Sequence, residues 1–234
     1  MRTRIKVCGL TREADVDAAV EAGVDALGFV FYAASPRAVT AERARVLARR
    51  VPAWVSLVGL FVDASRGDIL KTADLAGLSH LQLHGDEPPE DCLGLGRPVI
   101  KALRIRPVAD PAQRQAEQAR LSGLLARYSG CAAVLLDTDS TGFGGSGQAF
   151  DWQVVGPELR NDPLRSRTWV LSGGLESGSV GLAVAQLRPA CVDVSSGVER
   201  LEGGVVVKGQ KDAQRIREFV AAVQAADLIN MERT

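Results

Sequence analysis

Short apolar runs alternate with amphipathic stretches along most of the chain, and this alternation predicts a repeating strand–helix fold. Eight runs are nearly continuous in apolar and β-favouring residues, as expected for strands of a parallel sheet that is covered on both faces. The predicted strands span residues 5–8, 26–31, 56–62, 80–84, 99–103, 133–137, 169–171 and 192–194.

Each predicted strand is followed by a stretch with helical periodicity. In the first such stretch, alanines recur at positions 14, 18, 19 and 22, which is the spacing of one helix face. The predicted helices span residues 12–22, 41–50, 66–76, 90–95, 111–129, 152–159, 177–187 and 211–226.

Eight strand–helix units in 234 residues predict a TIM (β/α)8 barrel that forms a single domain over residues 1–234. An open doubly wound sheet is the competing fold, but it usually has fewer strands and often a G-x-G-x-x-G motif after the first. Here that position reads CGLT. The segment EGGVVVKG (202–209) interrupts the alternation and predicts a loop or short hairpin, and residues 228–234 are expected to form a loose C-terminal tail.

Composition narrows the function classes. Lys plus Arg and Asp plus Glu number 28 each, which argues against a nucleic-acid surface or a polybasic membrane anchor. The N-terminus has no apolar run of signal-peptide length, and no stretch of 18 apolar residues occurs in the sequence, so we expect a cytoplasmic protein. The four cysteines are scattered without a C-x-x-C pair, which predicts free thiols.

Two glycine-containing segments predict a phosphate site. Active sites of these barrels lie at the carboxyl ends of the strands, and phosphate frequently binds in the loops after strands seven and eight. SGGL (172–175) and DVSSGVE (193–199) occupy those two places. Backbone N–H groups of Gly173, Gly174, Ser196 and Gly197 are the candidate donors; the alternative is that the glycines only form tight turns.

A third glycine-rich segment, GFGGSG (142–147), follows the sixth strand. Its composition suits a mobile loop that folds over a ligand, with Gly144 and Gly145 as further N–H donors. The alternative is a flexible linker.

Cys8 and Asp137 end the first and sixth predicted strands and are candidates for acid–base chemistry. A thiolate can accept a proton and a carboxylic acid can donate one, so the two could move protons in an isomerisation without a metal. Asp137 ends the apolar run AAVLLD, where desolvation favours the protonated, donating form. For Cys8 the alternative is a small buried core residue, and Asp139 is an alternative to Asp137.

Two further residues are candidates for contacts with the substrate. Arg37, in the SPR segment after the second strand, could form a two-point contact with a substrate carboxylate; alternatively it is a solvated arginine. His84 ends the fourth strand and either lines the substrate pocket or packs in the core.

Lys6 has the same strand parity as Cys8 and is expected to face the barrel interior. A buried lysine needs a charge partner, and Asp193 or Asp137 could supply it. We interpret Lys6 as structural or as a support for the catalytic residues.

These motifs together resemble those of the phosphoribosylanthranilate isomerase family of tryptophan biosynthesis. The resemblance runs through KVCGLT, DALGFVFY, SPR, VGLFVD, LQLHGDEP, LLDT, GGSGQAFDW, LSGGL, VDVSSGVE and the KD before the last helix. It covers most of the chain. One departure is the segment 201–210, which looks longer than the usual connection in that family.

The resemblance implies an eight-fold barrel and an Amadori rearrangement of N-(5-phosphoribosyl)anthranilate to 1-(2-carboxyphenylamino)-1-deoxyribulose 5-phosphate. It implies that Cys8 is the general base, that Asp137 is the general acid, and that Arg37 contacts the anthranilate carboxylate. It further implies a small phosphorylated substrate and neither cofactor nor metal. We expect a monomer or a homodimer, with no nucleic-acid or membrane partner.

Three alternatives remain open at this point. A metal-dependent pentose-phosphate epimerase would need rim His and Asp ligands, of which only His84 is well placed. An indole-glycerol phosphate synthase would be expected to carry a catalytic Lys and Glu on its rim. A non-catalytic binder of phosphorylated metabolites would keep the glycine loops and lose the chemistry.

Overall fold

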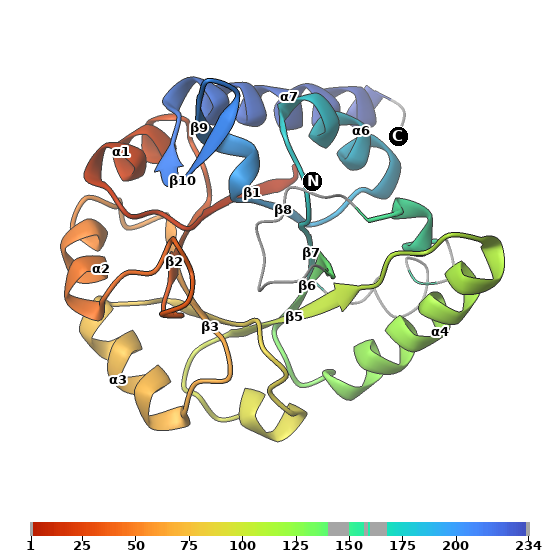
Figure 1. Ribbon diagram of the computed structural model, residues 1–234, viewed down its shortest axis with the longest axis horizontal. Helices are drawn as coiled ribbons and strands as arrows, with labels where there is room; N and C mark the ends of the chain where they lie inside the picture. The colour runs from red at the N-terminus through yellow and green to blue at the C-terminus, as the bar shows by residue number, and fades with distance from the viewer. Residues whose placement is uncertain (1, 140–149, 157–158, 160–167, 233–234) are drawn as a thin grey trace.

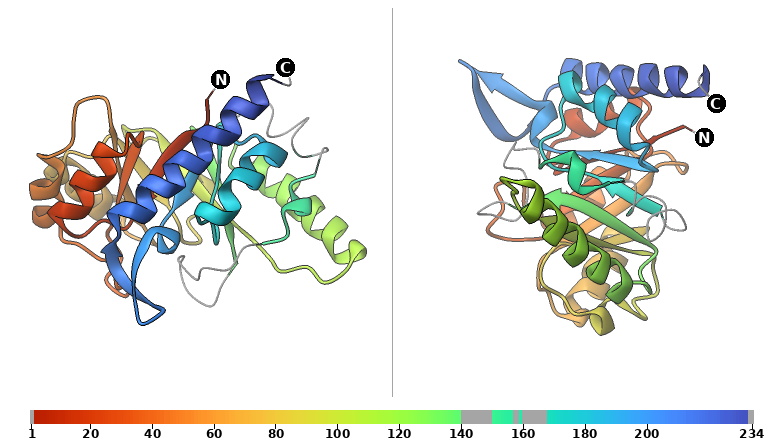
Figure 2. Two further views of the ribbon diagram at one scale, coloured as in Figure 1. Left: turned by 90° about the horizontal axis from the view of Figure 1, so that it is seen from above. Right: turned by 90° about the vertical axis from the view of Figure 1, so that its right-hand side faces the viewer.

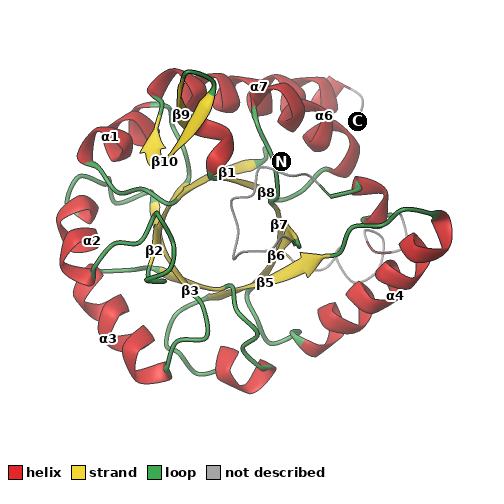
Figure 3. Cartoon of the chain, in the orientation of Figure 1, coloured by secondary structure: helices red, strands yellow, loops and turns green. Residues whose placement is uncertain are grey.

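The computed structural model describes residues 2–139, 150–156, 159 and 168–232 and confirms the closed barrel. Eight parallel strands pair in chain order, and β8 pairs with β1 to close the ring, with helices packed around the outside (Figures 1 and 3). The strands are β1 (Arg4–Cys8), β2 (Ala26–Val30), β3 (Ser56–Phe61), β4 (His80–Leu83), β5 (Val99–Ile105), β6 (Ala133–Thr138), β7 (Thr168–Leu171) and β8 (Cys191–Val194).

The α-helices of the described residues begin and end close to the predicted positions in most cases. They are α1 (Glu13–Glu21), α2 (Ala41–Ala48), α3 (Arg66–Ala76), α4 (Pro111–Arg127), α6 (Ser177–Leu187) and α7 (Ala213–Glu232). Side-chain caps fix several of the starts: Thr40, Ser65 and Asp110 each accept a hydrogen bond from a backbone N–H in the first turn of α2, α3 and α4.

Two predicted helices are wrong in whole or in part. The helix expected at 90–95 is only a short 3₁₀ turn, η1 (Pro89–Cys92), because Leu93 is already extended. Gly94 and Gly96, with positive φ angles of 66° and 69°, then prevent a helix from resuming. The helix expected at 152–159 starts with a second 3₁₀ turn, η2 (Trp152–Val154). Positions 157–158 lie outside the described residues.

The C-terminal segment is helical where we expected a loose tail. Helix α7 continues to Glu232, and Asn230 Nδ2 donates to the carbonyl oxygen of Val184 at 3.4 Å. At its other end, α7 follows a two-stranded antiparallel hairpin of β9 (Glu199–Glu202) and β10 (Val205–Lys211). This confirms the hairpin interpretation of 202–209, and Figure 2 shows the hairpin projecting from the barrel.

Apolar side chains of the described residues form three clusters, of which one, around Cys8, belongs to the candidate active site described below. The largest lies between the barrel wall and the helices, and a smaller cluster of Ala102, Leu135 and Val170 lies inside the ring. Among the described residues, no helix is both long enough and apolar enough to cross a membrane.

A buried ion pair braces the carboxyl ends of β3 to β5. Lys101 Nζ donates to Glu87 Oε2 at 2.8 Å and to the carbonyl oxygen of Gly85 at 2.6 Å. Glu87 Oε1 accepts from the backbone N–H groups of Asp63 and Gly85 at 2.9 and 3.1 Å. The pair therefore ties three successive strand ends together beside His84.

Replacing Lys101 by methionine should lower the free energy of unfolding by about 3–5 kcal/mol, because it leaves the Glu87 carboxylate buried without its cation. Urea denaturation measures the change. The double variant K101M/E87Q should recover part of the loss, since its buried amide carries no charge. Equal stability of K101M and the parent protein would contradict the role of this pair.

Candidate active site

Cys8 and Asp137 lie at the same end of the barrel. Cys8 is the last residue of β1, and Asp137 is the penultimate residue of β6, three strands away around the ring in the order β1, β8, β7, β6. Both side chains are buried, with residue exposures of 4% and 5%. The parallel barrel thus brings the two predicted catalytic residues to its carboxyl mouth.

The thiol of Cys8 occupies a space that a neighbouring glycine leaves open. Gly28 of β2 pairs with Cys8 in the sheet register, and a Cβ atom on Gly28 would lie 2.7 Å from Cys8 Sγ. Cys8 also packs against a small apolar cluster of Val30, Leu60 and Val62. A larger residue at position 28 would displace the sulfur from this place.

Lys6 lies one interior layer below Cys8, as its parity predicted. Its Nζ donates to Asp193 Oδ1 at 2.8 Å, and the two residues are register partners across the β1–β8 junction. Burial opposes the charge on Lys6, but Asp193, together with Cys8, raises the pKa of Lys6 above its usual value. Asp193, rather than Asp137, is therefore the partner of Lys6.

The protonation of Cys8 is set by opposing influences. Burial raises the pKa of the thiol above its ordinary value of 9.0, and the Asp193 carboxylate adds to this, while the ammonium groups of Lys6 and Lys211 act in the opposite direction. In the free protein the thiol therefore holds its proton through the neutral range.

Alkylation of Cys8 by iodoacetamide should consequently rise about tenfold per pH unit across the neutral range, because only the thiolate reacts. Mass spectrometry of the peptide that contains Cys8 measures the rate. The reaction should not level off below pH 9, since burial raises the pKa of Cys8 above 9.0. A plateau near neutrality would contradict a thiol protonated in the free protein.

Asp137 is held by groups on both sides. Its Oδ1 accepts from the backbone N–H of Thr138 at 2.9 Å, and its Oδ2 lies 3.2 Å from His84 Nε2. Gln82 Nε2 contacts the other ring nitrogen, Nδ1, at 3.0 Å. An imidazole that accepts from this amide at Nδ1 carries its proton on Nε2, facing Asp137. The structure therefore places His84 beside the predicted acid.

The loops after β7 and β8 contact each other and the end of β6. A Cβ on Gly197 would lie 1.9 Å from the carbonyl oxygen of Leu175, and one on Gly173 would lie 2.3 Å from Thr138 Oγ1. The N–H groups of Gly173, Gly174, Ser196 and Gly197 have no hydrogen-bond acceptor within the described part of the chain. These four donors lie in two loops that contact each other, and Gly173 lies beside Thr138 and Asp137. Gly144 and Gly145 lie outside the described residues.

Arg37 lies over the residue that follows Cys8. A Cβ on Gly9, whose φ is +77°, would come within 2.5 Å of Arg37 Cδ. The guanidinium pairs with Glu199 through Nε to Oε1 and Nη2 to Oε2, both at 2.7 Å. Arg37 is thus a buried, paired arginine rather than a solvated one, and one of its two hydrogen-bonding edges is occupied.

Glu199, Lys211 and Gly28 carry parts of this arrangement and received no role from the sequence. Glu199 and Lys211 lie within motifs that carry the family resemblance, VDVSSGVE and the KD before the last helix. Their burial was not evident, since charged residues in a loop are mostly exposed. Gly28 lies within the motif DALGFVFY, which also carries the resemblance, but its place opposite Cys8 depends on the pairing of β1 with β2.

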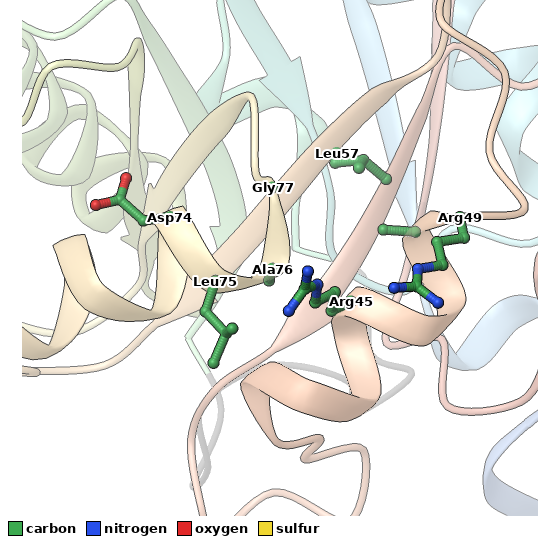
Figure 4. Close-up of a pocket in the computed structure, with 8 residues that line it drawn as sticks. Arg45, Arg49, Leu57, Asp74, Leu75, Ala76 and Gly77 are labelled. Atoms are coloured by element: carbon green, nitrogen blue, oxygen red, sulfur yellow. The ribbon is translucent and has the colours of Figure 1, made fainter.

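Two hollows lie away from these residues. One, of about 500 Å³, lies on the outer wall between α2 and α3 and includes Arg45, Arg49, Leu57 and Asp74 (Figure 4). The other, of about 760 Å³, opens at the amino ends of the strands and includes Arg4, Trp54 and His80. Neither contains Cys8, Asp137 or Arg37, and barrel enzymes place their chemistry at the carboxyl ends.

A closed barrel with a thiol and a carboxyl group at its carboxyl mouth, and with N–H donors in the loops after β7 and β8, has the groups that proton transfer on an anionic substrate would require of a barrel enzyme. Comparison with known proteins narrows this class. The family described as N-(5'phosphoribosyl)anthranilate (PRA) isomerase matches residues 5–222, and the chain belongs to this family.

Individual relatives agree over nearly the whole chain. The chain is 48% identical to the N-(5'-phosphoribosyl)anthranilate isomerase of Methylibium petroleiphilum, covering 97% of this chain and 96% of that protein. It is 47% identical to that of Pseudomonas putida strain W619, covering 95% and 98%. The crystal structure of the Thermotoga maritima phosphoribosyl anthranilate isomerase superposes with a TM-score of 0.80 at 36% identity, covering 95% of this chain and 99% of that one.

Proposed function

We propose that this chain converts N-(5'-phosphoribosyl)anthranilate into 1-(2-carboxyphenylamino)-1-deoxyribulose 5-phosphate, with Cys8 as the general base and Asp137 as the general acid. Family membership supports the isomerase activity. A similar structure, at 35% identity and a TM-score of 0.76, is a phosphoribosyl anthranilate isomerase in complex with a reduced form of that product. The single observation that carries the residue roles is the common position of Cys8 and Asp137 at the barrel mouth.

In this proposal, Asp137 gives its proton to the furanose ring oxygen, and the ring opens to a Schiff base. Cys8 then removes the proton from C2 in its thiolate form, which is the minor form in the free protein because burial raises the thiol pKa. The resulting enolamine becomes the ketone by losing the proton of its C2 hydroxyl and gaining a proton at C1, so this tautomerisation leaves the number of protons unchanged. His84 orients the Asp137 carboxyl group through its Nε2 contact at 3.2 Å. Because the reaction moves protons without a net redox change, two positioned acid–base groups suffice.

The ends of the substrate have separate binding groups. The N–H groups of Gly173, Gly174, Ser196 and Gly197 bind the phosphate, which suits donors in the loops after β7 and β8. Arg37 binds the anthranilate carboxylate with the guanidinium edge that Glu199 leaves unoccupied. Gly144 and Gly145 remain candidates for further phosphate contacts.

Loss of substrate fluorescence on addition of the purified protein tests the function. We expect the signal to decay at a rate proportional to enzyme concentration, and the rate to be unchanged in excess chelator. Loss of activity with chelator would instead favour a metal-dependent sugar-phosphate enzyme, and tight binding without turnover would favour a non-catalytic binder. Either result would overturn the proposal.

The assembly state is a separate part of the proposal. One similar structure is of monomers generated from a dimeric phosphoribosyl anthranilate isomerase of Thermotoga maritima. We expect this chain to be a monomer or a homodimer in the cytoplasm, and light scattering of the purified protein distinguishes the two states.

A further inference from the structure

Two charged residues close the base of the β9–β10 hairpin. Glu199 is the first residue of β9 and Lys211 is the last of β10, and the two are register partners. Both side chains are completely buried, with 0% exposure, and Lys211 Nζ lies 3.3 Å from Glu199 Oε1. A buried ion pair at the root of an exposed hairpin requires a reason, because desolvating two charges is costly.

Neither of these residues is available to a substrate. Glu199 accepts from Arg37 Nε and Nη2 at 2.7 Å each, from Gly209 N at 2.8 Å and from Lys211 Nζ. The Lys211 ammonium also donates to the carbonyl oxygen and hydroxyl of Ser195 at 2.9 and 3.3 Å. All three of its N–H donors are therefore used within the protein.

Arg37, by contrast, keeps one edge unoccupied. The inner edge of the guanidinium consists of Nε and Nη2, and it is bound to Glu199. The outer edge consists of Nη1 and Nη2, and its Nη1 has no partner among the described residues. A guanidinium offers two N–H groups along each edge and can bind a carboxylate in a two-point contact. Glu199 thus fixes the orientation of the Arg37 guanidinium, and the outer edge can bind a second carboxylate.

We propose that Glu199 and Lys211 are positioning residues for the isomerase, and that they hold the outer edge of Arg37 in place for the carboxylate of the substrate. The inference rests on the proposed function and assigns a purpose to the hairpin. Neither residue touches the reacting atoms; each acts through Arg37.

The charge of the cluster supports a carboxylate ligand. With Arg37 and Lys211 positive and Glu199 negative, the buried group carries one net positive charge, whereas Lys6 and Asp193 balance each other. Burial, with the Arg37 charge, lowers the pKa of Lys211 to about 8, although Glu199 and Cys8 oppose the shift. A substrate carboxylate would neutralise this excess charge and stabilise the protonated lysine.

The base of the hairpin also contacts the loops that follow β1 and β2. Gly209, with a φ of +80°, accepts from Thr11 Oγ1 at 2.6 Å through its carbonyl oxygen, and a Cβ there would lie 3.1 Å from the carbonyl oxygen of Pro36. Ser195 Oγ donates to the carbonyl oxygen of Cys8 at 3.1 Å. The base therefore contacts Arg37 directly, through Glu199, and reaches Cys8 through Ser195, to which Lys211 donates. A Cβ atom added at Gly203 or Gly204 in the exposed tip would meet nothing within 4 Å.

The test compares Glu199→Gln with the parent protein on two substrates: the natural one, and the analogue with aniline in place of anthranilate, which lacks the carboxylate. For the natural substrate we expect KM to rise roughly tenfold to a hundredfold, the range for a charge-assisted hydrogen bond. The value of kcat should stay within about threefold, because the carboxylate contact is equal in ground and transition states. For the analogue, E199Q and the parent should have the same kcat/KM.

Glu202→Gln is the matched control, since Glu202 lies on the same hairpin strand with its side chain 61% exposed, and it should leave both substrates unaffected. Equal loss on both substrates in E199Q would reveal a merely structural role and overturn the inference, as would an unchanged preference for the carboxylate. If E199Q fails to fold, Lys211→Met decides by the same comparison. Absence of turnover by the parent protein would instead refute the proposed function itself.

Discussion

Replacing Cys8 by alanine should lower kcat for N-(5'-phosphoribosyl)anthranilate by roughly 10²–10⁴-fold, the range for loss of a general base. Neither neighbour can replace the thiol as the base. Gly28 on the neighbouring strand contributes no side chain, and Lys6 is paired with Asp193. KM should change much less, since the phosphate and carboxylate groups of the substrate are bound elsewhere. Fluorescence assays at saturating substrate measure the loss.

Cys92→Ala is the control for this result. Cys92 is also buried, at 3% exposure, but it lies in η1 on the outer side of the barrel, where its thiol contacts the carbonyl oxygen of Pro88. The control should retain the parent kcat, although a smaller side chain lowers its stability. Retention of parental activity by Cys8→Ala would remove Cys8 from the mechanism.

The barrel was predictable because its signal is local and repeated. Each strand is an apolar run that turn residues delimit, and every predicted strand starts and ends within two residues of the observed one. The segment at 90–95 shows the limit of such reasoning. Its apolar spacing suits a helix, but Gly94 and Gly96 take left-handed backbone conformations, and short helices depend on tertiary packing more than on propensity.

The position of Cys8 and Asp137 at the same end of the barrel could be predicted from topology alone, since parallel strands of a barrel end on one face. The partners of the charged residues could not be predicted in this way. Lys6 had two candidate partners, and only the register of β1 against β8 selects Asp193. Arg37 and Glu199 are 162 positions apart, and their contact depends on how the hairpin folds back toward the loop after β2.

The hairpin also shows why an apparent insertion can matter. From sequence, the segment 201–210 was notable only for its length. In the structure its tip is exposed, with Val205 70% accessible, whereas its base places Gly209 and Lys211 against Glu199. The exposed tip accounts for the extra length of the segment, whereas the residues at its base contact Glu199. We therefore expect substitutions at the base, and not at the tip, to change the activity.

Replacing Asp137 by asparagine should lower kcat by roughly 10²–10⁴-fold, because the amide keeps the shape of the side chain but cannot deliver a proton to the ring oxygen. The contacts of Oδ1 with Thr138 N and of Oδ2 with His84 Nε2 can persist in the amide through its carbonyl oxygen at one of the two positions. KM should therefore change little.

Asp139→Asn is the control that distinguishes the loss of a proton donor from the loss of one negative charge at the barrel mouth. Asp139 lies two residues further along the chain, and its backbone N–H, not its side chain, bonds to the carbonyl oxygen of Ile105 at 2.8 Å. We expect the Asp139 variant to keep the parent kcat. The opposite pattern, with activity lost in Asp139→Asn and kept in Asp137→Asn, would transfer the acid role to Asp139. Because both substitutions remove one carboxylate from the same strand exit, only the position of the proton donor can distinguish their effects.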